Sequence, residues 1–188
     1  YRCGDTGAAT DNQIKPHLNI VNTGSSGIPF QELTARYYYT KEGTAEETFY
    51  IDWAQIGGAN ITGTFHAGYL EMGFTSGAGT LSAGSTSGEI QIRFHMNDWS
   101  NYNEGDDYSY DGNITSFTDR SQITLYRNGA LIWGTEPGGT VTIAPTPGPT
   151  SADTPAPGAG DVWCVPAAQT VASVIAAVAG FLAVVAIL

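Results

Sequence analysis

Short runs in which apolar and polar residues alternate are the feature that most constrains the fold of this chain. In the clearest run, residues 89–95, every second residue is apolar and the residues between them are polar. A period of two residues is that of a β-strand with one face in the core and the other in solvent. The run therefore predicts a strand with Gln91, Arg93 and His95 on its outer face.

Similar runs recur along the first three quarters of the chain, and turn residues separate them. The other stretches of strand character cover residues 14–22, 33–40, 49–56 and 69–74. Asn128-Gly129 lies between two further runs, and both residues tolerate the positive φ of a tight hairpin. No long stretch has helical period, so we expect an all-β domain, with a β-sandwich as its arrangement.

The composition changes near Pro137 and divides the chain into three parts. Residues 1–137 form the expected domain, and residues 138–160 are rich in Pro, Thr and Gly, as in a disordered linker. Residues 161–188 are mostly apolar, and the nineteen residues from Thr170 to Leu188 would be about 28 Å long as a helix. We expect a hydrophobic C-terminal helix that associates with a membrane.

The form of membrane attachment stays open. Small residues at 158–160, a spacer at 161–169 and the apolar end resemble a signal for a lipid anchor. A terminal transmembrane helix is the alternative, although no Lys or Arg follows Arg127 to act as a positive-inside signal. Burial of the tail in a soluble partner is the weaker alternative. We expect an extracellular protein attached to the cell surface, with a catalytic or scaffold region upstream of Tyr1.

Charge and side-chain patterns argue against several functions. The formal net charge is −11, which would repel a polyanion, so nucleic acid is not expected as a partner. A glycosidase needs two carboxylates that face each other across a cleft, and a small sandwich with a flat face offers none. The three histidines, His17, His66 and His95, lack zinc-ligand spacing, and we expect them on strand surfaces. These patterns indicate a protein that is not an enzyme.

Several separated motifs occur in one order along residues 1–137. They are DNQIKPHLNIVNTGSS, RYYYT, DWAQIG, FTSGAGTL, RFHMNDWSNYNEGDDYSY and NGALIWGTEP. Together they resemble family 3 carbohydrate-binding modules, the cellulose-binding type found in bacterial cellulases and cellulosome scaffolds. The resemblance implies a jelly-roll β-sandwich of about nine strands, a flat binding face and a structural calcium ion. It implies non-catalytic binding of crystalline cellulose, which targets an attached protein or cell surface to plant polysaccharide. A surface adhesion or scaffold protein that uses the module is the alternative, and a glycoside hydrolase is the third possibility.

The resemblance also assigns residues to the binding face. The family's planar strip corresponds here to Asp52, Trp53, Arg93 and Trp99, and its polar anchors correspond to Asn12 and Gln91. Rings in such a strip stack on sugar C–H groups, while amides and carboxylates bond to hydroxyls. We expect an ion pair between Arg93 and Asp52, whose guanidinium plane would act as a third platform.

The calcium ligands implied by the resemblance come from two separated loops. They are Thr40, Glu42, Asn103, Asp106 and Asp107. Hard oxygen donors in irregular geometry suit calcium, which takes six to eight of them. Glu42 stands where we would expect an aspartate, so its side chain would have to fold back by one methylene. A solvated acidic loop is the alternative.

Three further positions carry expectations from the family. Its disulfide-forming pair corresponds to Ile51 and Gly58, so we expect packing to hold that loop. Only HAG separates Phe65 from Tyr69, and the family's tyrosine near this end of the strip has no counterpart, so the strip would be shorter. A shallow groove on the opposite face corresponds to Arg36, Tyr38 and Tyr108; it would bind a linker peptide or a single glycan chain, although packing explains tyrosines equally well.

Overall fold

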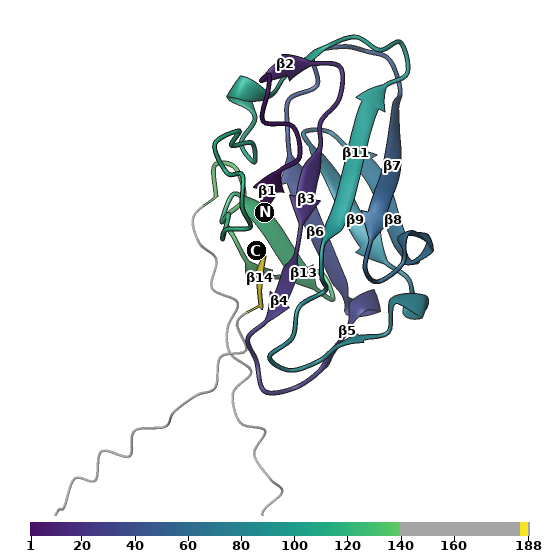
Figure 1. Ribbon diagram of the computed structural model, residues 1–188, viewed down its shortest axis with the longest axis vertical. Coiled ribbons are helices and arrows are strands. Elements are labelled where there is room, and N and C mark those ends of the chain that lie inside the picture. The colour runs from purple at the N-terminus through teal and green to yellow at the C-terminus, as the bar shows by residue number, and fades with distance from the viewer. Residues whose placement is uncertain (140–184, 188) are drawn as a thin grey trace, which may run out of the picture. The chain divides into compact units, whose positions relative to one another are not determined.

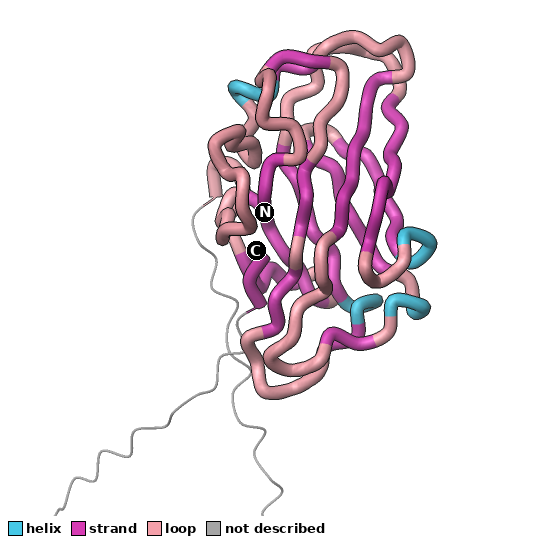
Figure 2. Tube along the Cα trace, in the orientation of Figure 1, coloured by secondary structure: helices cyan, strands magenta, loops and turns pink. Residues whose placement is uncertain are grey.

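The computed structural model describes residues 1–139 and 185–187, and most of its strands form two antiparallel sheets (Figures 1 and 2). One sheet has four strands in the order β1 (Arg2–Cys3), β3 (Pro16–Leu18), β11 (Ile90–Met96) and β7 (Glu47–Ala54). The other has five in the order β14 (Ala130–Trp133), β13 (Ile123–Arg127), β6 (Leu33–Tyr38), β9 (Tyr69–Phe74) and β8 (Ile61–His66). The expected β-sandwich of about nine strands is confirmed.

Short elements close the ends of the sandwich. Two-residue strands pair β2 (Thr10–Asp11) with β12 (Tyr102–Asn103), and β5 (Ile28–Pro29) with β10 (Thr80–Leu81). Four 3-10 turns complete the described elements: η1 (Phe30–Glu32), η2 (Gly58–Asn60), η3 (Ser76–Ala78) and η4 (Glu104–Asp106). Pro16 begins β3, as expected of a residue that cannot donate to a ladder.

The core lies between the two sheets and is rich in aromatic rings. The apolar residues of β11 point into it, and the ring of Phe94 lies 4.9 Å from Tyr39, 5.7 Å from Phe65 and 5.9 Å from Tyr102 between centroids. The predicted inner face of this strand is therefore confirmed. Tyr38 was expected on an outer face but is buried, because Tyr69 and Tyr108 pack against its ring.

A β-bulge in β7 decides which side chains reach the outer face of the four-stranded sheet. Gln91 pairs with Trp53, whereas Ile92 pairs with Ile51, so Asp52 is an extra residue without a partner in the ladder. Consecutive residues of a regular strand point to opposite faces. Because the bulge interrupts that alternation, Asp52 and Trp53 are both exposed.

Two predicted turns and one predicted loop contact are present in the structure. The hairpin at Asn128-Gly129 joins β13 to β14, with φ values of 50° and 78°. His66 pairs with Tyr69, so only two residues join β8 to β9 in a tight hairpin. Gly58 lies close to Ile51, where an added Cβ would be 3.1 Å from Ile51 Cγ2.

The C-terminal segment differs from the expected helix at the three residues that the structure describes. Val185–Ile187 form β15, which pairs antiparallel with β4 (Ile20–Asn22), the continuation of β3. An edge strand with unpaired backbone groups accepts such an addition. The expected linker at 138–160 lies, from residue 140, outside the described residues, as does most of the expected tail. Within the described ranges, no helix has the length and apolar character needed to cross a membrane.

Candidate ligand-binding face

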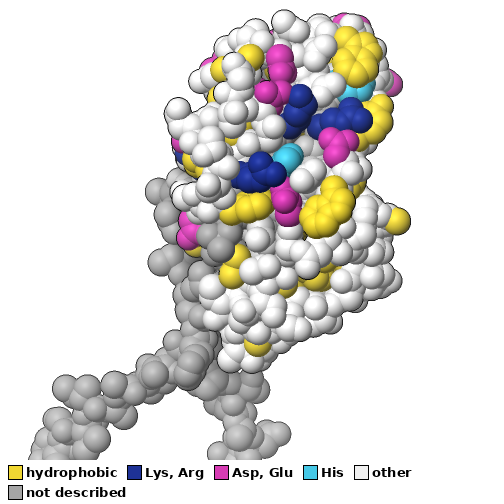
Figure 3. Space-filling view, in the orientation of Figure 1, with side chains coloured by type: hydrophobic (Ala, Val, Ile, Leu, Met, Phe, Trp, Pro, Cys, Tyr) yellow, Lys and Arg dark blue, Asp and Glu magenta, His cyan; other side chains and the backbone are white. Residues whose placement is uncertain are grey.

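The outer face of β3, β11 and β7 carries the residues that the sequence assigns to the strip. Aromatic, basic, acidic and histidine side chains gather on this face (Figure 3). Trp53 is 48% exposed and Trp99 is 50% exposed, unusual values for large rings. Asp52 is exposed beside Trp53 as a result of the bulge. The fold therefore brings four predicted residues, Asp52, Trp53, Arg93 and Trp99, to one sheet face and the loop that follows it.

Arg93 occupies the middle of this face. Its Nε donates to Asp52 Oδ1 at 2.8 Å, which is the expected ion pair. Its guanidinium carbon also lies 4.3 Å from the centroid of the Tyr50 ring, within the range of a cation–π contact. Two contacts on different sides fix a flat cationic group that still faces solvent in part.

Tyr50 lies on the same face but was not among the predicted strip residues. It is 38% exposed and pairs in register with Arg93 across β7 and β11. The available signal was its spacing, because Tyr50 lies two residues before Asp52 and so shares its face of the strand. β7 thus adds an exposed aromatic ring to this face.

His95 was predicted on the outer face of its strand and exposed there; the face is confirmed, but the exposure is wrong. It projects from the outer face of β11 but is only 4% exposed, because Trp99 covers it. The two rings lie 3.9 Å apart between centroids at an interplanar angle of 13°. Tyr50 stacks beside His95 at 5.4 Å and 18°. The other two histidines differ, since His17 is partly exposed and His66 is exposed.

A self-bonded turn presents Trp99. Its backbone N–H donates to the Met96 carbonyl at 2.9 Å, and its φ is 60°, a left-handed value that is unusual for a residue with a side chain. Asp98 Oδ1 accepts hydrogen bonds from the backbone N–H of Ser100 at 3.1 Å and its hydroxyl at 2.7 Å. Contacts on both sides of Trp99 therefore fix the path of this turn.

The two predicted anchors have different surroundings. Gln91 Nε2 donates to Glu89 Oε1 at 3.1 Å, and the same oxygen accepts from Arg2 Nη2 at 2.5 Å and contacts His17 Nδ1 at 3.0 Å. Burial by itself raises the pKa of Glu89, but these donors hold it below the ordinary value. Asn12 follows β2 and precedes Ile14, which bridges to Phe94; it lies apart from this network.

Two hydrogen bonds join the segments that carry the candidate calcium ligands. Thr40 N–H donates to Asp107 Oδ1 at 2.6 Å, and Asn103 N–H donates to Glu42 Oε1 at 3.0 Å. Asp107 Oδ2 is buried and has no hydrogen-bond partner among the residues that the structure describes. An orphaned carboxylate oxygen in this position fits a cation, because a buried anionic oxygen without a partner is costly.

The carboxylates around Asp107 also favour a bound cation. Burial, followed by repulsion from Glu42 and Asp106, raises the pKa of Asp107 to about 7. Burial and the nearby carboxylates also raise the pKa of Glu104 to about 8. No group of three or more His, Cys, Asp or Glu side chains converges as a metal site within residues 1–139. The carboxylates of Glu42, Asp106 and Asp107 therefore do not converge in this structure, and a calcium site would also need the Thr40 hydroxyl and the Asn103 amide oxygen.

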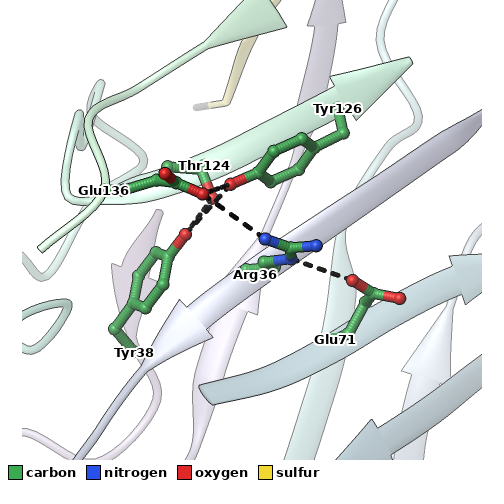
Figure 4. Close-up of polar contacts among 6 residues, drawn as sticks. All are labelled: Arg36, Tyr38, Glu71, Thr124, Tyr126 and Glu136. Carbon is green, nitrogen blue, oxygen red and sulfur yellow. Dashed lines mark hydrogen bonds and ion pairs between the residues drawn. The ribbon is translucent and has the colours of Figure 1, made fainter. Parts of the chain in front are cut away.

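Two of the groove residues, Arg36 and Tyr38, lie on β6 of the opposite sheet, and the third, Tyr108, packs against Tyr38 from the loop after η4. Arg36 Nε donates to Glu71 at 2.9 Å, and its guanidinium carbon lies 4.1 Å from the Tyr126 ring centroid (Figure 4). Glu136, which directly precedes Pro137, accepts from both Arg36 and Tyr126. Tyr38 hydroxyl bonds to Thr124 at 2.8 Å. Each polar group drawn in Figure 4 thus has a partner within this surface.

The carboxylates do not form the pair that a glycosidase requires. Asp52 lies on β7 and pairs with Arg93, while Glu71 lies on β9 of the other sheet and pairs with Arg36. Glu104, Asp106 and Asp107 belong to the candidate calcium region. These five carboxylates are therefore divided among three separate places on the domain.

Comparisons with known proteins agree with this geometry. The family model described as "Cellulose binding domain" matches residues 1–134. Endoglucanase A from Paenibacillus lautus is 51% identical over 144 residues, which cover 73% of this chain and 21% of that protein. The "Uncharacterized protein in celA 5′ region" of the same species is 50% identical over 144 residues, covering 73% of this chain and 99% of that protein. The solved module CBM3b from the cellulosomal cellobiohydrolase 9A of Clostridium thermocellum has a TM-score of 0.70 and 38% identity, covering 74% of this chain and 96% of that one.

Proposed function

Because this chain belongs to family 3 of the carbohydrate-binding modules, we propose that its strip binds the flat surface of crystalline cellulose without hydrolysing it. The family assignment makes the chain a cellulose-binding module rather than an enzyme. The observation that carries the proposed site is the convergence of exposed Trp53 and Trp99 with the Arg93–Asp52 pair on one sheet. Their role in this chain is to hold an attached protein or cell surface on plant polysaccharide.

The chemistry of the strip suits a repeating sugar surface. Indole faces stack on the C–H groups of glucose rings, and the guanidinium and carboxylate bond to hydroxyls between them. Each stacked ring contributes about 0.5–1.5 kcal/mol beyond its buried area. A dissociation constant of 1 μM corresponds to about −8.2 kcal/mol, so two rings alone bind a short soluble sugar weakly. Affinity comes from simultaneous contact along a rigid surface.

A pull-down on microcrystalline cellulose tests this proposal. Residues 1–137 should bind, and the double variant Trp53→Ala/Trp99→Ala should bind about tenfold more weakly or worse. Tyr108→Ala on the opposite sheet is the control and should bind like the unaltered module. Undiminished binding in the double variant would reject the strip. Loss of binding in Tyr108→Ala alone would place the site in the groove, and release of reducing sugar would reject the non-catalytic role.

Calcium is the proposed structural cofactor. Thr40, Glu42, Asn103, Asp106 and Asp107 would hold it, and the ion would supply positive charge beside the buried Asp107 oxygen. The pairing of Glu42 with the Asn103 backbone supports a glutamate in this set, because its longer side chain already reaches the second loop. These residues join two loops of the fold and leave the strip free for cellulose.

Extracellular display through the C-terminal segment is the proposed localisation. The composition of residues 138–160 suits a spacer, and the apolar run 170–188 suits a membrane anchor, either a helix or the signal for a lipid. Fractionation of cells that express the whole chain tests this, and the protein should sediment with membranes. Full recovery in the soluble fraction, without detergent and with the tail intact, would refute attachment. Release by a phosphoinositide-specific phospholipase would select the lipid anchor.

An upstream catalytic or scaffold region is the proposed partner within a longer protein. This chain spans 21% of Endoglucanase A but 99% of the second relative, so modules of this size occur in both settings. Sequence upstream of Tyr1 distinguishes them: a glycosidase domain would indicate a cellulase, and repeated interaction domains would indicate a scaffold. Neither would indicate an adhesion protein.

A further inference from the structure

The ring of His95 is almost wholly enclosed although its strand position faces outward. Trp99 covers it in a parallel stack with centroids 3.9 Å apart, while Trp99 itself remains half exposed. One face of the indole thus rests on the imidazole, and the other is available to a ligand. A ring can stack on a flat crystal surface only if it lies parallel to that surface. The contacts that fix the plane of the Trp99 indole therefore also affect binding.

A second support lies beside the first. The Tyr50 ring is nearly parallel to His95, at 18°, and the guanidinium carbon of Arg93 lies 4.3 Å from the Tyr50 centroid. His95 and Tyr50 therefore lie side by side beneath the strip. The His95 ring contacts Trp99, and the Tyr50 ring contacts Arg93. The ring planes of Trp99, His95 and Tyr50 are thus nearly parallel from one ring to the next.

The Met96 carbonyl links His95 to the turn above it. This oxygen accepts from the backbone N–H of Trp99 at 2.9 Å and contacts His95 Nδ1 at 2.9 Å. Because a carbonyl oxygen can only accept, Nδ1 carries the proton of this hydrogen bond. One atom thus holds both the ring beneath and the backbone of Trp99, whose left-handed φ needs such external support.

We propose that His95 and Tyr50 are positioning residues that form a supporting layer beneath the strip and set the planes of Trp99 and Arg93. The inference rests on the proposed function, because it assigns the ligand to the upper faces of these groups. His95 does not touch cellulose. It acts through Trp99, and the quality of the aromatic stack decides how well the strip fits a flat surface.

Crossed substitutions at His95 separate its ring from its hydrogen bond. His95→Phe keeps an aromatic plane and removes the donor, whereas His95→Asn keeps a donor and removes the plane. We expect His95→Phe to bind cellulose within about twofold of the unaltered module and His95→Asn to bind about two- to tenfold more weakly. His66→Ala is the matched control, because it removes a similar stack on Tyr69, at 4.7 Å and 16°, outside the strip. It should leave binding unchanged.

A fluorine NMR measurement without cellulose tests the positioning role of His95 separately from cellulose binding. The protein is labelled with 5-fluorotryptophan, and Trp99→Phe identifies the fluorine resonance of Trp99. That resonance should move toward the value of an exposed indole in His95→Asn and stay near its original position in His95→Phe. An unchanged resonance together with unchanged binding in His95→Asn would overturn the role of His95. Failure of the unaltered module to bind would refute the proposed function, while the resonance would still decide the positioning role.

Tyr50→Leu keeps the inference testable if His95→Asn does not fold. Tyr50 is more exposed, and leucine retains apolar bulk but offers no plane under Arg93. We expect binding about two- to tenfold weaker at unchanged melting temperature. Binding equal to that of the unaltered module would remove Tyr50 from the supporting layer.

Discussion

Arg93 occupies the middle of the proposed strip, and its ion pair contributes little to the stability of the fold. Both partners of the Arg93–Asp52 pair are partly exposed, and such pairs contribute about 0–1 kcal/mol to stability. The same side chain is fixed from two sides, by Asp52 and by the Tyr50 ring. In the proposed strip, its planar, delocalised charge would serve as a platform rather than as a support for the fold.

Arg93→Lys should weaken adsorption to cellulose by about three- to tenfold, because a lysine keeps the charge but loses the plane. The melting temperature should change little. Adsorption isotherms and thermal melts measure the two effects. Arg127→Lys is the matched control, since Arg127 pairs with Glu32 at 2.7 Å on the other sheet and should leave adsorption unaltered. Equal adsorption by both variants would mean that only the charge of Arg93 is used.

At the scale of elements, the sequence predicts strands well where the alternation is long. β9 has the predicted bounds and β11 lies within one residue of them, whereas β8 was missed because Gly63 interrupts its apolar positions. Two-residue strands such as β1 are too short to carry a period. The bulge at Asp52 depends on pairing between β7 and β11, which are far apart in the sequence. The cover of Trp99 over His95 is local but depends on the left-handed φ of Trp99, which the alternation of apolar and polar residues does not predict.

A disulfide between positions 51 and 58 would show how much a covalent link across this loop adds to the stability of the fold. In the double variant Ile51→Cys/Gly58→Cys, the facing positions should form a disulfide, and closure of this loop should stabilise the fold by about 2.5 kcal/mol in the chain-entropy estimate. The oxidised variant should melt about 5–10 °C above the same variant when reduced. The unaltered protein under both conditions controls for its own cysteines. Free thiols after oxidation would show that the two positions do not face each other.

At the scale of the whole module, the candidate calcium ligands connect distant parts of the chain. One loop follows β6 in the five-stranded sheet, and the other follows β12. A shared ion would cross-link these loops and offset the repulsion among Glu42, Asp106 and Asp107. Because the ligands belong to loops rather than to the strip, calcium should act on stability and leave cellulose affinity nearly unchanged below the melting temperature.

Chelation should therefore lower the melting temperature of the module. A ligand that binds only the native state stabilises it by about 2.7 kcal/mol at a hundredfold excess over its dissociation constant, and this contribution is lost when the ion is removed. Asp107→Asn should melt lower than the unaltered module and lose most of its response to chelator, because one buried ligand oxygen becomes an amide. Asp98→Asn makes the same change of charge on an exposed loop outside the ligand set and should keep the full response. Thermal melts with and without chelator, paired with elemental analysis, decide the matter: an identical melting curve and no bound metal would reject the calcium site.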